Sequence, residues 1–269
     1  LGIEHNAVLI VNTYGEYCRY QAVPLISIGT IDDSVAPENS TFPDILHSQR
    51  KAYISDNLMQ AASSQLHSFR IFLRLRQINR YIQITILCSC LPPDVLDLLD
   101  ELNRRKPVWI ELGLQTIHDK TLHAIRSGFT LSQFEQAVSD LHKRNIPVIT
   151  HLILGLPGET KEDMLSSVRY VGSLPVTGIK LQLLHILKGT DLGTAYMADP
   201  FPLFTLEEYC DLIADCIALL PPEIVIHRLT GDGPRNLLLA PLWSTDKKRV
   251  LNTIQKCLRE RDLWQGKNI

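Results

Sequence analysis

The chain has 269 residues, of which 45% are hydrophobic and 21% are charged, and this composition fits one barrel-type domain or two small globular domains. Its 27 basic and 29 acidic residues leave a net charge of -2, which gives no support for nucleic acid or an anionic membrane as a main partner. No apolar run reaches the roughly 18 residues of a membrane helix. The six cysteines are too sparse for a disulfide scaffold, which favours a cytoplasmic protein.

Residues 1–50 have weak periodicity and are treated as an N-terminal segment that has diverged. The apolar runs at 7–11 and 23–29 are typical of short strands, and the turn formers at 32–43 predict a loop. Residues 69–80, FRIFLRLRQINR, carry apolar residues beside four arginines. They fit either an amphipathic surface helix or a stripe that binds phosphate or RNA.

Apolar strands and helical segments alternate in the rest of the chain. The predicted strands are 84–88, 108–114, 146–154, 178–187 and 223–229. The predicted helices between and after them are 93–105, 119–126, 132–144, 161–174, 207–220 and 246–261. This order predicts an α/β fold with a parallel sheet and right-handed crossovers, covered on both faces as in a barrel or a doubly wound sheet.

Residues at the helix ends support these boundaries. Pro92 and Pro93 open the helix at 93–105, because proline is tolerated in a first helical turn. Gly128 suits a left-handed C-terminal cap. Thr160 with Asp163, and Thr205 with Glu208, have the spacing of capping boxes.

Polar residues follow four of the predicted strands, where ligands of parallel α/β folds bind. The strand at 108–114 and its end contribute Glu111, Gln115 and Thr116, and the end of the strand at 146–154 contributes Gly155, Leu156, Pro157, Gly158 and Glu159. The strand at 178–187 and its end contribute His185 and Lys188, and the strand at 223–229 and the loop after it contribute His227, Arg228, Asp232 and Arg235. Their convergence at one edge of the sheet predicts a ligand site.

Several of these residues also have a purely structural interpretation. The segment GLPGET, at 155–160, is either a tight strand-to-helix turn or a backbone cradle beside the positive end of a helix. It is not a P-loop, since the Gly-Lys-Ser/Thr ending is absent. Glu111 lies in an apolar strand and requires either an ion-pair partner, such as Lys180, or a ligand.

The basic and histidine candidates remain open in the same way. Arg126 is either solvated or a bidentate clamp for a carboxylate. His151 and His185 fit core histidines as well as site residues. Asp232 and Arg235 lie in a glycine-containing loop of the kind that often carries binding residues.

The segments ELGLQTIHDKTL, IRSG, HLILGLPGET, GIKLQLLHILKGT and PPEIVIHRLTGDGPRNLLLAPLW occur in this order over about residues 91–267. Together they resemble the radical S-adenosylmethionine superfamily, and within it the YhcC-like family, whose core is related to Elp3-type enzymes. The resemblance implies a partial (β/α)6 TIM-like barrel, which we place at 51–245, followed by a C-terminal helix and tail at 246–269.

The resemblance also implies cofactors and residue roles. A [4Fe-4S] cluster, reduced by an electron donor, would cleave S-adenosylmethionine to a radical that abstracts hydrogen from a substrate. Glu111 and Gln115 would lie beside the S-adenosylmethionine, Arg126 would meet its carboxylate, and residues 155–159 would form the turn beside its adenine. The substrate side would carry His185, Lys188, His227 and Arg228.

One feature of the superfamily is not found. Its cluster is held by three cysteines after the first strand, whereas the equivalent region here, about 24–43, contains no cysteine. Two alternatives therefore stand beside a radical enzyme. The first is a degenerate, cluster-less barrel that acts as a nucleotide-binding or scaffold protein, and the second is a metal-free enzyme using Lys188, His185 or Asp232 as acid-base groups.

Overall fold

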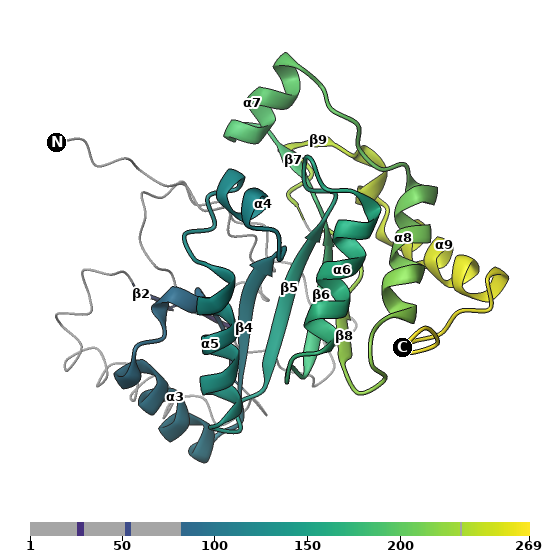
Figure 1. Cartoon of the computed structure of the whole chain (residues 1–269). Coiled ribbons are helices and arrows are strands. Elements are labelled where there is room, and N and C mark those ends of the chain that lie inside the picture. Colours follow the sequence, from purple (N-terminus) through teal and green to yellow (C-terminus); the bar gives the residue numbers. More distant parts are fainter. Residues whose placement is uncertain (1–25, 30–51, 55–81, 232) are drawn as a thin grey trace, which may run out of the picture. The chain divides into compact units, whose positions relative to one another are not determined.

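The computed structural model describes residues 26–29, 52–54, 82–231 and 233–269 (Figure 1). The chain forms two compact units. The described residues of the larger unit are 114–132, 150–231 and 233–269. The smaller unit contains 133–149 and the described residues between 22 and 113.

One sheet contains seven of the described strands, in the order β2-β1-β3-β4-β5-β6-β8. Their bounds are β1 Ile26–Gly29, β2 Ala52–Ile54, β3 Ile82–Ile86, β4 Val108–Gln115, β5 Val148–Leu154, β6 Gly178–Leu183 and β8 Val225–Arg228. Strand β1 pairs antiparallel with both β2 and β3. Strands β3 and β4 are parallel, as are β6 and β8. The five strands from β3 to β8 are the parallel sheet expected from the alternation of strands and helices.

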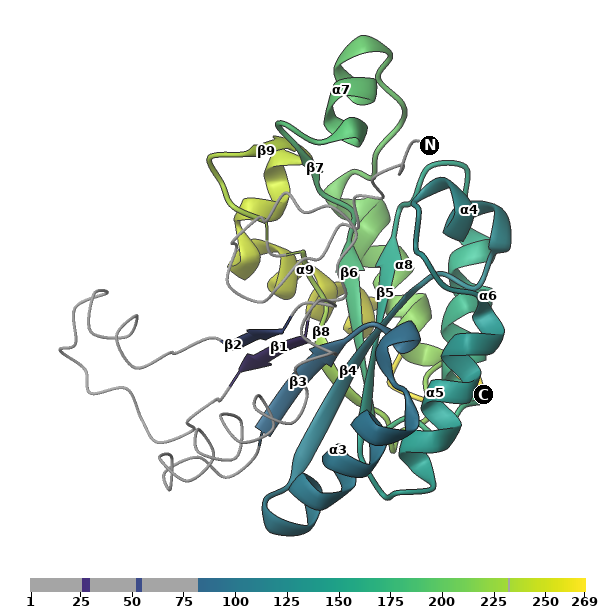
Figure 2. The ribbon, with the colours of Figure 1, turned by 90° about the vertical axis from the view of Figure 1, so that its left-hand side faces the viewer.

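In the smaller unit, helices α3 (Pro93–Arg105) and α5 (Leu131–His142) lie side by side on one face of β3 and β4 (Figure 2). The apolar residues of α3 recur every three positions, so that Leu96, Leu99 and Leu102 are buried on one side of the helix. Polar contacts join α3 to the end of α5, since Arg144 pairs with Asp97 at 3.2 Å. The helix at 93–105 has the predicted bounds.

In the larger unit, helix α8 (Leu206–Ala218) packs against α6 (Lys161–Gly172) and α9 (Lys247–Glu260) (Figure 1). Both predicted capping boxes are confirmed. The hydroxyl of Thr160 accepts from the backbone N–H of Asp163, and that of Thr205 accepts from Glu208. In each case the carboxylate reaches back to the backbone N–H of the threonine, which satisfies two helix-end donors at once. The larger unit also contains the short helix α4 (Asp119–Ala124).

The predicted strand at 178–187 is wrong in one respect, because it is two strands. Leu184 still donates its backbone N–H to Leu154 at 2.9 Å. Beyond it, β7 (Ile186–Leu187) pairs antiparallel with β9 (Leu238–Ala240) in a separate small sheet. Helix α7 (Asp191–Ala198), capped by the Thr190 hydroxyl, follows β7 and was not predicted. Two 3-10 turns, η2 (Cys88–Cys90) and η3 (Leu242–Thr245), complete the described elements.

The remaining predictions of chain organisation are not tested. The runs at 7–11, 32–43 and 69–80 lie outside the described residues, and the boundaries at 50 and 245 stay predictions. Among the described residues, no helix combines the length and the apolar character that a membrane crossing requires.

Candidate functional site

The turn that follows β5 is fixed by two glycines in the left-handed region. Gly155 has a φ of 90° and Gly158 a φ of 84°. The backbone N–H of Glu159 donates to the carbonyl of Leu156 at 3.1 Å, with Pro157 and Gly158 between them. Proline followed by a glycine of positive φ is the arrangement of a type II β-turn. Pro157 and Gly158 are exposed, so the backbone at the tip of the turn is open to a ligand.

The base of this turn is packed into the larger unit. A Cβ added to Gly155 would lie 3.2 Å from the Phe204 ring and 3.9 Å from the Leu184 Cβ. Leu156 is buried with Leu184 and Ile186 in an apolar cluster. Leu156 therefore anchors the turn in the core, whereas Pro157 and Gly158 form its exposed tip.

The turn is joined to the loop after β4. The buried Thr116 donates its hydroxyl to Oε1 of Glu159 at 2.6 Å. Gln115, directly before it, has a φ of 69°, which is uncommon for a residue with a side chain and indicates local strain. His118 binds the backbone carbonyl of Asp163 at 3.0 Å through Nε2. The hydrogen bond between Thr116 and Glu159 thus joins the segment that contains Gln115 to the turn after β5.

Partial burial raises the pKa of the Glu159 carboxyl, and this effect is larger than the opposing effects of its hydrogen bonds from Thr116 and Thr121. A carboxyl group whose pKa is raised on folding holds its proton more tightly in the native state than in the unfolded state. Its contribution to stability is therefore most favourable at low pH. It is lost as the pH rises from the ordinary value of 4.5 through the raised value.

Glu159→Gln is expected to remove this pH dependence while keeping an oxygen that accepts from Thr116. The free energy of unfolding of the wild type should fall relative to that of the variant as the pH rises above about 4.5. Urea unfolding between pH 4 and pH 8 measures the difference. Glu162→Gln, on the exposed surface of α6, is the matched control, and an equal change in both variants would contradict the assignment to Glu159.

Arg126 lies at the end of α4, with a φ of 55°. Its Nη1 donates to Oδ2 of Asp191 at 3.1 Å, and both side chains are exposed, at 53% and 83%. Asp191 is the first residue of α7. The Asp191 carboxylate shows that the Arg126 guanidinium can receive a carboxylate from this side.

The residues after β6 divide between packing and exposure. His185 is half-buried, and its ring packs so closely on Gly231 that a Cβ there would collide with it. The side chain of Lys188 is exposed, while its backbone N–H donates to Leu237 at 2.8 Å. His185 thus lies against the loop that precedes Pro234, as the strand-end rule expects.

The residues of β8 lie elsewhere. Val225 pairs with Gly178 and Arg228 with Lys180, so β8 runs beside the beginning of β6. A Cβ on Gly178 would lie 2.6 Å from the His227 ring. His227 and Arg228 are therefore placed beside the start of β6 and are not brought together with His185.

The two loop candidates after β8 have different outcomes. Arg235 is exposed and donates to the backbone carbonyl of Thr245 at 2.8 Å, a contact that holds the loop to η3. Asp232 lies outside the described residues.

Glu111, in the smaller unit, is 2% exposed and accepts hydrogen bonds from two side chains of β3. One comes from Nε2 of Gln83 and the other from the Thr85 hydroxyl at 3.2 Å. These donors satisfy part of the buried carboxylate. The ion pair with Lys180 and the role toward a ligand both stay predictions.

Sequence reasoning named His151 as either a core or a site histidine, but it missed Gln182, the buried partner of His151 in the larger unit. His151 and Gln182 are joined at 3.3 Å between Nδ1 and Nε2, and both are buried, as is Lys180. Lys180 and Gln182 alternate with apolar residues in β6, so they share one face of the strand. This alternation was readable in GIKLQL. The contact between His118 and Asp163 of α6 was also missed, because the two residues are 45 positions apart.

Comparison with known proteins identifies the family of the chain. A model of the radical SAM superfamily matches residues 58–171, and a model of the radical SAM C-terminal domain matches residues 176–260. The chain belongs to the radical SAM superfamily. The predicted resemblance is therefore confirmed.

Two bacterial proteins place the chain within the YhcC-like, Elp3-related part of the radical SAM superfamily. YtqA of Bacillus subtilis is 41% identical over 69% of this chain and 58% of its own length. YhcC of Escherichia coli is 38% identical over 64% of this chain and 56% of its own length. This chain thus spans little more than half the length of these relatives.

The fold of this radical SAM protein is also found in Elp3 of Methanocaldococcus infernus, solved without its first 46 residues. The two structures superpose with a TM-score of 0.59 at 17% identity, over 68% of this chain and 42% of the other. This likeness confirms the predicted α/β fold of the partial-barrel kind.

The described thiols of this radical SAM protein do not fit a [4Fe-4S] cluster. Cluster irons are held by cysteine thiolates. Cys88, Cys210 and Cys216 are buried, and burial raises the pKa of Cys88 to about 12. Within residues 82–231 and 233–269, no three His, Cys, Asp or Glu side chains are grouped so that they could hold a metal. Cys18 lies outside the described residues.

Proposed function

We propose that this chain binds S-adenosylmethionine at the turn 155–159 of its larger unit. The observation that carries the proposal is the exposed type II turn, joined through Glu159 to Thr116 at the end of β4. Membership of the radical SAM superfamily supports S-adenosylmethionine as the ligand. The chain spans little more than half the length of its relatives. The proposal is therefore limited to binding of S-adenosylmethionine and does not extend to the activity of a full-length relative.

The residues near the turn fit the chemistry of this ligand. S-adenosylmethionine carries a carboxylate, an ammonium group and an adenine ring. Arg126 offers a guanidinium that already holds one carboxylate, that of Asp191. The open backbone at Pro157 and Gly158 offers N–H and C=O groups to the edge of a base.

The other candidates keep the roles that the resemblance implies. In this proposal Gln115 contacts the cofactor, and His185 with Lys188 faces the substrate. The cofactor role of Glu111, which lies in the smaller unit, stays a sequence prediction. The position of His227 and Arg228 beside the start of β6 weakens their assignment to the substrate side. Arg235 supports its loop through Thr245. Asp232 stays a sequence prediction, as does the cytoplasmic location.

When a reduced cluster is bound, the superfamily's reaction is reductive cleavage of S-adenosylmethionine followed by hydrogen abstraction. The described thiols do not supply its ligands, so we derive no step through it. The same observation favours the second candidate function, a cluster-less protein that binds a nucleotide-like ligand without cleaving it.

Titration calorimetry with S-adenosylmethionine tests the binding. Arg126→Ala is expected to weaken the affinity by about tenfold, the usual loss for a charge-assisted hydrogen bond. Lys120→Ala, which removes an exposed cation of α4, is the matched control. Asp191→Asn, which frees Arg126 from an exposed pair, should tighten binding by no more than about fivefold.

An unchanged affinity in Arg126→Ala would contradict the carboxylate assignment, and no binding by the wild type would contradict the proposal itself. Iron and acid-labile sulfide content, with electron paramagnetic resonance after anaerobic reconstitution, separates the two candidate functions. About four irons per chain, with a signal that changes on addition of S-adenosylmethionine, would establish the radical enzyme. S-adenosylmethionine binding without iron would establish the cluster-less protein.

A further inference from the structure

Helix α7 presents an acidic side chain to a residue of the proposed site. Asp191, its first residue, receives Nη1 of Arg126 at 3.1 Å through Oδ2. Arg126 is the residue proposed to hold the carboxylate of S-adenosylmethionine. The guanidinium therefore already contacts a carboxylate that belongs to the protein itself.

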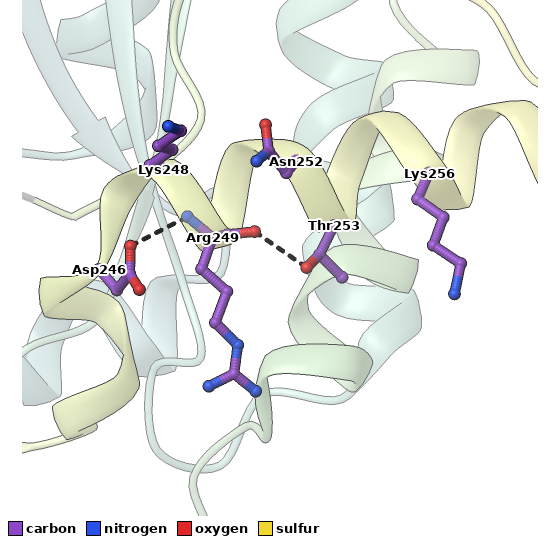
Figure 3. Close-up of a pocket in the computed structure, with 6 residues that line it drawn as sticks. All are labelled: Asp246, Lys248, Arg249, Asn252, Thr253 and Lys256. Carbon is purple, nitrogen blue, oxygen red and sulfur yellow. Dashed lines mark hydrogen bonds between the residues drawn. The ribbon is translucent and has the colours of Figure 1, made fainter.

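The exposed cations of α9 have no such arrangement. Figure 3 shows Lys248 and Arg249 on opposite sides of α9, so they do not converge on one point. The carboxylate beside them, that of Asp246, accepts from the backbone N–H of Arg249 at 3.0 Å and caps the helix. Arg126 differs because a carboxylate from another element lies against its guanidinium.

The backbone that carries Asp191 is held firmly in place. The hydroxyl of Thr190 accepts from the backbone N–H of Gly193 at 2.9 Å and donates to the carbonyl of Leu187 at 2.9 Å. Gly193 is buried, and a Cβ added to it would collide with the Leu187 carbonyl oxygen. The first turn of α7 thus lies directly against β7, and it presents the Asp191 carboxylate from a fixed position.

Helix α7 also packs on the base of the turn 155–159. Leu192 and Tyr196 are half-buried against an apolar cluster that contains Leu156, the anchor of that turn. Arg126, α7 and the turn all belong to the larger unit. The position of Asp191 is therefore coupled by packing to the proposed site.

The strength of the pair suits a contact that a ligand can displace. A ligand carboxylate and the Asp191 carboxylate are equivalent acceptors for a guanidinium, and they repel each other when both lie beside it. Both side chains of the pair are exposed, and an exposed ion pair shifts an equilibrium by at most about fivefold. Asp191 can therefore lower the affinity for a ligand without closing the site.

We infer that Asp191 is an internal competitor for the ligand carboxylate, an inference that rests on the S-adenosylmethionine site proposed for Arg126. Binding of the ligand moves the Arg126 guanidinium from the Asp191 carboxylate to that of the ligand. The effect is confined to ligands that carry a carboxylate. Asp191 also favours the start of α7, where an anion meets the positive end of the helix, but that structural role affects all ligands alike.

Calorimetric titration of the full 269-residue chain with two ligands separates these roles. The ligands are S-adenosylmethionine and its decarboxylated analogue, which lacks the carboxylate and keeps the ammonium group. Asp191→Asn should bind S-adenosylmethionine about two- to fivefold more tightly and bind the analogue with unchanged affinity. Asp199→Asn removes an exposed carboxylate from the other end of α7 and, as the matched control, should change neither affinity.

A double-mutant cycle shows whether the effect passes through Arg126. In the Arg126→Ala background, Asp191→Asn should change neither affinity. The melting temperature of Asp191→Asn shows that the variant is folded, and it should fall slightly because the first turn of α7 loses an anion.

The inference is overturned by equal tightening for both ligands, or by tightening that persists in the Arg126→Ala background. Wild-type binding of S-adenosylmethionine that Asp191→Asn leaves unchanged or weakens overturns the inference alone. If neither the wild type nor Asp191→Asn binds S-adenosylmethionine, the proposed function fails together with the inference.

Discussion

Gly155→Ala is expected to lower the free energy of unfolding by about 2–5 kcal/mol and to abolish measurable binding of S-adenosylmethionine. The backbone at this position has a φ of 90°, which a residue with a Cβ adopts only with strain. The added methyl group would also lie 3.2 Å from the Phe204 ring. Either the turn or the ring must move, and both hold the site.

Gly158→Ala separates the two causes. Gly158 has a similar φ of 84°, but nothing lies within 4 Å of an added Cβ. The variant should therefore show only the backbone cost, about 1–2 kcal/mol. Urea unfolding of both variants measures the difference, which reports the packing against Phe204. Equal losses in the two variants would show that Phe204 does not support the turn.

The segment at 155–160 shows how far sequence reasoning reaches. Two glycines around a proline, followed by Thr160 and Asp163, predict a turn and a helix start without any knowledge of the rest of the fold. Both features are present. They are local because each depends on hydrogen bonds between residues three or four positions apart.

Contacts between distant segments could not be predicted in this way. Thr116 and Glu159 are 43 positions apart, and nothing in either segment names the other. Arg126 pairs with Asp191, which is the first residue of α7. Because α7 was not predicted, this pair could not be predicted either. Its alternating small and apolar residues, DLGTAYMA, lack a clear helical stripe.

The register of β8 is a second feature that the sequence could not predict. The sequence EIVIHRL predicted a strand correctly, and the strand-end rule then placed His227 and Arg228 at the site. The structure pairs β8 with the first residues of β6, at Gly178 and Lys180. Register depends on which residues of two strands meet, and a single strand contains no information about that.

Tyr209→Ala is expected to lower the free energy of unfolding by about 3–5 kcal/mol, the usual loss when a buried aromatic ring is removed. Tyr209 is fully buried on α8. Its ring centroid lies 5.6 Å from that of Trp243 and 6.3 Å from that of Phe204. Its hydroxyl donates to the backbone carbonyl of Leu229 at 3.1 Å. The ring thus joins α8 to η3 and to the residue that contacts Gly155.

Tyr209→Phe is the matched control, because it keeps the ring and removes only the hydroxyl. Its loss should be about 1–2 kcal/mol, from the carbonyl of Leu229 that is left without this donor. Guanidinium unfolding measures both variants. Since Phe204 lies between Tyr209 and Gly155, the alanine variant should also weaken S-adenosylmethionine binding while the phenylalanine variant keeps it. If both variants bind equally well, the aromatic cluster supports the fold without holding the turn, and the turn is held by Leu156 and by the contact between Thr116 and Glu159.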